Sequence, residues 1–116
     1  MYKFPIIELV DRYCIAKLKF NKLGTNQSEL DFYTDQIKLI DFEKIKDDLD
    51  ELYEIHSQIW EMEDDFKRCV VEYKYPLDEI GRRAIAVRDI NSKRYDIKNR
   101  ISDKLNDPIK EIKKYG

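Results

Sequence analysis

His56, Trp60 and Glu63 are the residues of this 116-residue sequence whose types and spacing come closest to a chemical site. Their spacing of i, i+4 and i+7 places them on one face of a helix. His56 is the only histidine, and it is not part of an ExxH or HExxH motif of the kind that bundle metal sites and zinc peptidases use. A general base would also need a neighbour that orients it, and the sequence identifies none. We therefore predict no metal site and no catalytic residue, and we interpret His56 as a structural group.

A second group of polar residues lies in the last third of the sequence. Helical spacing places Asn91, Arg94 and Lys98, at i, i+3 and i+7, along a line that adjoins an apolar face. Guanidinium and ammonium groups on such a line must meet either acidic residues of the protein or a bound anion. The candidate binding residues in this group are Arg83, Arg88, Asn91, Arg94 and Lys98.

Two interpretations of these basic residues stay open. In the structural one, the acidic residues at 63–65 pair with the arginines across a helical hairpin and fix its register. In the binding one, the arginines hold a phosphate or carboxylate of a small anionic ligand. We favour the structural interpretation, and we expect residue 64 to lie opposite residue 88.

Composition excludes several other classes of function. The chain carries 22 Lys and Arg against 24 Asp and Glu, a net charge of −2, so it lacks the basic excess of a nucleic-acid-binding protein. We expect no membrane span and no signal peptide, and the sequence contains no GxSxG motif and no phosphate-binding glycine loop. Cys14 and Cys69 have no CxxC partner, which predicts reduced thiols in a cytoplasmic protein. We predict no cofactor.

Apolar residues recur at alternating steps of three and four, which is the spacing of a helical bundle or coiled coil. Pro5 suits the start of a first helix, and Gly24 suits a left-handed cap after it. Pro76 ends the longest apolar pattern. The predicted segments are helices at 6–23, 28–74 and 77–105, followed by a tail at 106–116. Within 28–74 the apolar spacing skips to five residues after Ile40, which predicts a kink or a short break near 41–42.

The connections between these helices are short, so we expect neighbouring helices to run antiparallel. The predicted fold is all-α, a three-helix antiparallel bundle built on a long helical, coiled-coil hairpin. In the first helix, the predicted buried face consists of Ile6, Leu9, Tyr13, Ala16, Phe20 and Leu23.

The segments 8–19, 56–64 and 79–101 also resemble a family of short uncharacterised bacterial and phage proteins. The family reads roughly "H..IW.LE.DIR", then "EIGRRA..IRDIN.KR..IKN.I", after an opening similar to "ELLDKLTILEIK". The resemblance implies an all-helical cytoplasmic fold, and it places the candidate residues within the family pattern. It also implies a gene that lies beside genes for surface-polysaccharide and sugar-nucleotide synthesis, or in a phage genome. Tyr13 and Cys14 depart from the family's usual Leu-Thr.

Three functions are consistent with these features. The first, which we favour, is a non-enzymatic helical interaction or accessory protein that forms a homo-oligomer or binds a protein partner. The second is a protein that binds or acts on an anionic sugar-phosphate or nucleotide-sugar, with His56, Trp60 and Glu63 beside the basic residues. The third is a phage protein that binds a host protein. Nucleic acid and membrane are not expected partners.

Overall fold

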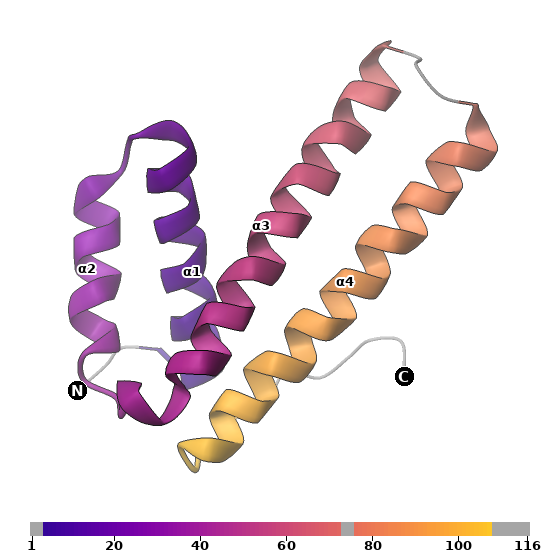
Figure 1. Ribbon diagram of the computed structural model, residues 1–116. Helices are drawn as coiled ribbons and strands as arrows, with labels where there is room; N and C mark the ends of the chain where they lie inside the picture. Colours follow the sequence, from indigo (N-terminus) through magenta and orange to yellow (C-terminus); the bar gives the residue numbers. More distant parts are fainter. Residues whose placement is uncertain (1–3, 73–75, 108–116) are drawn as a thin grey trace.

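The protein is all-helical over the residues that its computed structural model describes, which are 4–72 and 76–107, with α3 side chains as far as Asp65. The helices run alternately up and down, so that α1 is antiparallel to α2 and α3 is antiparallel to α4 (Figure 1). Four helices are present in these residues, one more than the sequence predicts. They are α1 (Ile6–Leu23), α2 (Gln27–Ile37), α3 (Phe42–Glu72) and α4 (Leu77–Lys104).

The additional helix arises where the sequence predicts a kink or a short break within 28–74. The chain breaks at 38–41, so α2 and α3 are two separate helices and not one kinked helix. Backbone bonds from Leu39 N to Gln36 O and from Ile40 N to Ile37 O, 3.1 and 3.3 Å long, tighten the end of α2 into a turn. The break lets α2 pack on α1 while α3 packs along α4. Residues 73–74 and most of the predicted tail lie outside the described residues.

Gly24 ends α1 as predicted. Its φ of 66° lies in the left-handed region, and its N–H donates to Phe20 O at 2.9 Å. Glycine adopts this conformation without the steric cost that a β-carbon imposes. The chain therefore reverses between α1 and α2 within a few residues.

The hydrophobic core lies where α1 contacts the lower halves of α3 and α4, and we call this region the base (Figure 1). In α1, the predicted face is only partly correct. Ile6, Leu9 and Ala16 are buried, but Leu23 is 60% exposed. α1 instead buries a wider face because it packs against three helices. The buried hydrophobic residues of α1 are Ile6, Ile7, Leu9, Val10, Cys14, Ala16 and Leu18.

Ion pairs between α3 and α4 close the lower end of the base. Asp48 on α3 is buried, and it accepts hydrogen bonds from Arg100 Nε at 2.8 Å and from Lys104 Nζ on α4. Arg100 Nη2 also donates to Glu51 Oε2 at 2.6 Å.

At the other end of α1, Lys22 reaches Glu61 of α3 at 3.3 Å. The polar contacts of α1 with α3 thus extend as far as Glu61.

Beyond Glu61, α3 and α4 continue past α1 and α2 as a projecting pair of helices (Figure 1). We call this region the arm and define it as residues 62–72 of α3 and 77–89 of α4. α3 has 31 residues, about 46 Å at 1.5 Å per residue, close to the longest extent of the molecule, 49 Å. The arm therefore contains the outer part of α3, the helix whose length is close to that of the molecule, together with the adjoining part of α4.

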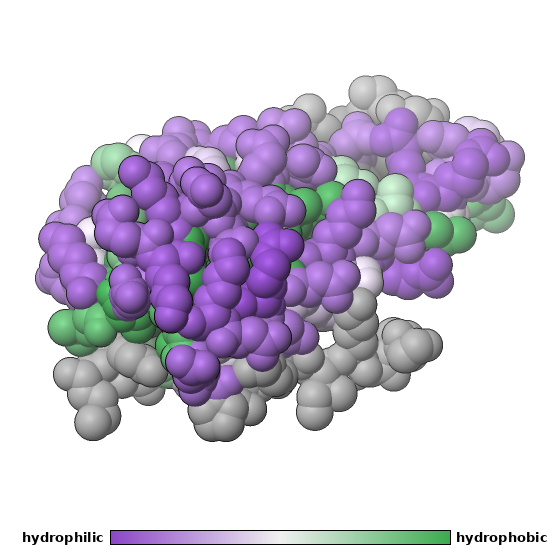
Figure 2. Space-filling model, turned by 60° about the horizontal axis from the view of Figure 1, so that its bottom comes forward, coloured by the Kyte–Doolittle hydropathy of each residue, from purple (hydrophilic) through white to green (hydrophobic). Residues whose placement is uncertain are grey.

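The arm exposes apolar side chains. Leu77 is 86% exposed and Ile85 is 51% exposed. In Figure 2, hydrophilic residues cover most of the base, while hydrophobic residues are also visible toward the right, where the arm lies in Figure 1. Within residues 4–72 and 76–107, no helix combines the length and apolar character that a membrane span requires.

Candidate functional site

Asp11 of α1, His56 of α3 and Lys98 of α4 meet inside the base, and Arg94 of α4 lies close enough for its charge to act on Asp11. We call these four residues the polar cluster. His56 Nε2 donates a hydrogen bond of 2.6 Å to Asp11 Oδ1. Lys98 Nζ lies 3.5 Å from the other carboxylate oxygen, Oδ2. The side chains of His56 and Lys98 are both only 5% exposed, and that of Asp11 is 17% exposed. One carboxylate thus ties α1 to both helices of the hairpin.

The charges of the polar cluster act most strongly on Asp11. Burial by itself raises the pKa of this carboxyl group, because it penalises the charged form. The hydrogen bond from His56 and the electrostatic interactions with His56, Lys98 and Arg94 lower the pKa. These interactions outweigh the burial, so the pKa of Asp11 is lowered from its ordinary value of 3.8. Asp11 is consequently held as a carboxylate at neutral pH.

Arg94 stands at the edge of the polar cluster. Its guanidinium carbon lies 5.1 Å from the centre of the Tyr95 ring, within the range of a cation–π contact. Its Nε atom is buried, and no hydrogen-bond partner for it is found among the described residues. Arg94 therefore contributes charge to the site while one of its donors is unused within the described part of the chain.

Asp11 is the residue of this site that sequence reasoning missed. Asp11 lies outside the apolar face predicted for the first helix, which follows Leu9, Tyr13 and Ala16. The buried residues Ile7 and Leu18 lie at i−4 and i+7 from Asp11, so Asp11 lies on the buried side of α1. A wider apolar face for the first helix would have revealed it.

The structure brings together only some of the predicted site residues. His56, Arg94 and Lys98 lie in the polar cluster, but Glu63 and Arg88 are exposed on α3 and α4. Trp60 is partly buried on α3, one turn above His56. The other members of the predicted set thus lie outside the cluster. Asn91 is half-buried and donates to Val87 O of its own helix at 3.1 Å, and Arg83 lies farther along the arm.

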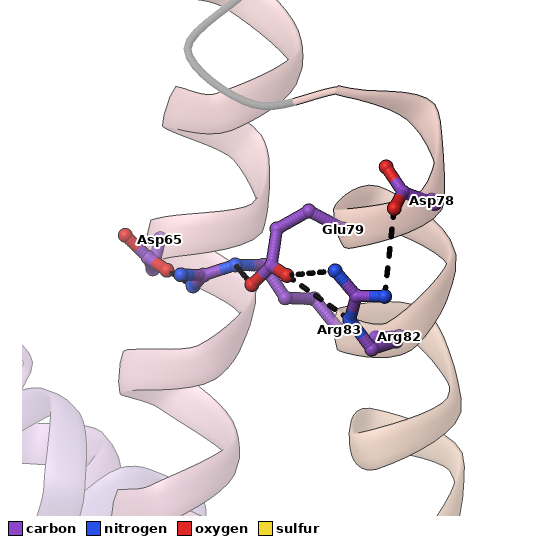
Figure 3. A network of polar contacts seen from close by, with 5 residues as sticks. All are labelled: Asp65, Asp78, Glu79, Arg82 and Arg83. Atoms are coloured by element: carbon purple, nitrogen blue, oxygen red, sulfur yellow. Dashed lines mark hydrogen bonds and ion pairs between the residues drawn. The ribbon is translucent and has the colours of Figure 1, made fainter.

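Arg83 closes an ion-pair network across the arm (Figure 3). Its side chain extends from α4 to Asp65 of α3, while its Nε donates to Glu79 Oε1 at 3.1 Å. Arg82 stays on α4, with contacts to Glu79 at 2.8 Å and to Asp78 at 3.5 Å. The pair of Asp65 with Arg83 is of the kind that the structural interpretation predicts. Arg88 lies 3.5 Å from its neighbour Asp89 on the same helix, and the pairing of residue 64 with residue 88 stays a prediction.

A pocket of about 340 Å³ lies beside this network. Its lining includes the carboxylates of Glu61 and Asp65 as well as the guanidinium of Arg83. Because Arg83 is already paired with Asp65 and Glu79, the pocket presents no excess of positive charge to an anion.

Nucleophilic and metal chemistry gain no candidate within the described residues. Cys14 is a buried free thiol, and burial raises its pKa, which keeps it protonated and unreactive. No group of three or more His, Cys, Asp or Glu side chains suited to a metal ion occurs in the described part of the chain. Comparison of the sequence with protein-family models and curated proteins, and of the fold with solved structures, found no match.

Proposed function

We propose that this protein is a non-enzymatic helical interaction module that self-associates through the arm. The observation that carries the proposal is the contrast between the two ends of the hairpin. In the base, α1 covers α3 and α4, whereas in the arm α3 and α4 extend past α1 and α2 and lie beside each other. An apolar helix face is stable when another element covers it, and Leu77 and Ile85 are large apolar side chains exposed to solvent.

The polar cluster supports the same proposal from the other end of the molecule. A closed set of buried charges that share one carboxylate fixes how three helices pack, which is the best-attested structural use of such groups. In this proposal α3 and α4 form an antiparallel coiled-coil hairpin, with α1 as the third helix of the base. The reduced thiol Cys14 is compatible with the cytoplasmic location that we include in the proposal.

Light scattering after size exclusion tests self-association. We expect the full chain at micromolar concentration to have a mass that is a multiple of 14.1 kDa and that falls on dilution. A mass of one chain at every concentration would overturn the proposal. A monomer that still captures a specific protein would favour the phage-protein alternative.

A second candidate function is the binding of an anionic sugar-phosphate or nucleotide-sugar at the polar cluster. One observation favours it: Arg94 Nε is buried without a described partner, next to the buried ammonium of Lys98. Inorganic phosphate and a panel of nucleotide sugars test it in a thermal-shift assay. A bound ligand at about 100 times its Kd would add about 2.7 kcal/mol of stability. An equal shift in an Arg94→Ala variant would place such binding elsewhere.

A further inference from the structure

We infer that the outer face of α4 in the arm is a two-fold symmetric contact with a second copy of the same chain. This inference rests on the proposed self-association and identifies its surface. The face consists of Asp78, Gly81, Ile85 and Arg88, at i, i+3, i+7 and i+10, the spacing of a coiled-coil seam. All four are exposed, and they lie on the side of α4 opposite to buried Ile90.

Gly81 supplies the space that such a contact needs. A glycine inside a helix costs up to about 1 kcal/mol of stability relative to alanine. A β-carbon at Gly81 would meet nothing within 4 Å, so close packing within the described chain does not account for the glycine. On the same face, one turn later, Ile85 is a large side chain left 51% exposed. A position without a side chain, Gly81, and a large exposed side chain, Ile85, therefore lie side by side on one surface.

A two-fold axis between these two positions makes the face complementary to itself. Suppose that two α4 helices run antiparallel and that the two-fold axis between them passes at the level of position 83. Each residue of one copy then lies opposite the residue of the other copy whose number, added to its own, gives 166. Ile85 of each copy then packs over Gly81 of the other. Asp78 of each copy meets Arg88 of the other, so both charged pairs are attractive. This agreement of shape and charge favours a second copy over an unrelated partner.

The two charged residues are available for a new contact. The Asp78 side chain is 70% exposed and lies 3.5 Å from Arg82 of its own helix. The Arg88 side chain is also 70% exposed and lies 3.5 Å from Asp89. Exposed pairs of this kind contribute little to folding, so exchanging their partners costs the monomer little. Reversing either charge should leave the fold intact and change only association.

Charge reversal at the two positions tests the contact. We expect Asp78→Arg alone and Arg88→Asp alone each to weaken self-association by about tenfold or more, because each variant places like charges opposite each other twice. An equimolar mixture of the two variants should recover the association of the parent, since both pairs become attractive again. Lys93→Asp, an exposed charge reversal outside the seam, is the matched control and should behave as the parent. Circular dichroism establishes that each variant folds.

Gly81→Leu tests independently whether the contact needs a residue without a side chain at position 81. Leucine is a better helix former than glycine, so the variant should unfold at a higher urea concentration than the parent while it associates less. Variants that associate as the parent does, or a mixture that fails to recover association, would overturn the α4 contact and leave self-association standing. A parent chain that is monomeric throughout would overturn the proposed function itself.

Discussion

Replacement of Asp11 by asparagine is expected to lower the free energy of unfolding by about 3 kcal/mol. The variant removes the carboxylate that lies 3.5 Å from the buried ammonium of Lys98 and that accepts the hydrogen bond from buried His56. Loss of one partner from a buried ion pair is costly because the remaining charge keeps its desolvation penalty. Urea unfolding followed by circular dichroism measures the loss.

The control for this variant is Asp35→Asn on α2. Asp35 is paired with Lys38 at 4.0 Å, but its side chain is 77% exposed, so removal of its charge should have no measurable effect. Lys98→Met should restore part of the stability when it is combined with Asp11→Asn, because it removes the buried ammonium that has lost the attraction of Asp11. An Asp11→Asn variant as stable as the Asp35→Asn control would contradict a structural role for the polar cluster.

The same carboxylate predicts how stability depends on pH. The pKa of Asp11 is lower in the folded chain than its ordinary value of 3.8, so ionisation of this group favours the folded state. Its contribution is complete above the unfolded-state pKa and is lost as the pH falls through the lower folded-state pKa. The difference in stability between the parent and Asp11→Asn should therefore shrink below about pH 4. If the difference in stability between the parent and Asp11→Asn grows as the pH falls, the predicted direction of the pH dependence is wrong.

Truncation of Leu52 to alanine is expected to cost about 2–5 kcal/mol, because Leu52 is fully buried in the base and the variant leaves a cavity. Leu77→Ala in the arm removes the same atoms from a side chain that is 86% exposed. At dilutions where the chain is a monomer, this second variant should unfold as the parent does. Similar losses for both variants would show that the core extends into the arm.

Much of α3 and α4 could be predicted from the sequence. Ile45, Leu49 and Leu52 are all buried, and each lies on the apolar face that the spacing predicts. The pattern is clear because the buried face of α3 recurs at regular helical spacing along its neighbours α4 and α1. The break at 38–41 also coincides with the skip in spacing, although the sequence does not distinguish a kink from a full reversal.

The candidate site was harder to predict, because it depends on three helices. His56 and Lys98 could be selected from spacing within their own helices, and both are buried. Their shared partner Asp11 comes from α1, and no spacing rule links positions so far apart in the chain. α1 packs on three neighbours, so its buried face is wide and can include a carboxylate. Contact between helices, not periodicity within one, determines which charges meet.

Amide hydrogen exchange of the full chain at two protein concentrations tests most directly whether the arm is the surface of self-association. If it is, exchange at residues 77–89 should slow as the concentration rises, while exchange in the base at residues 45–59 stays unchanged. Exchange that is independent of concentration throughout the arm, or that slows along α2 instead, would contradict self-association through the arm.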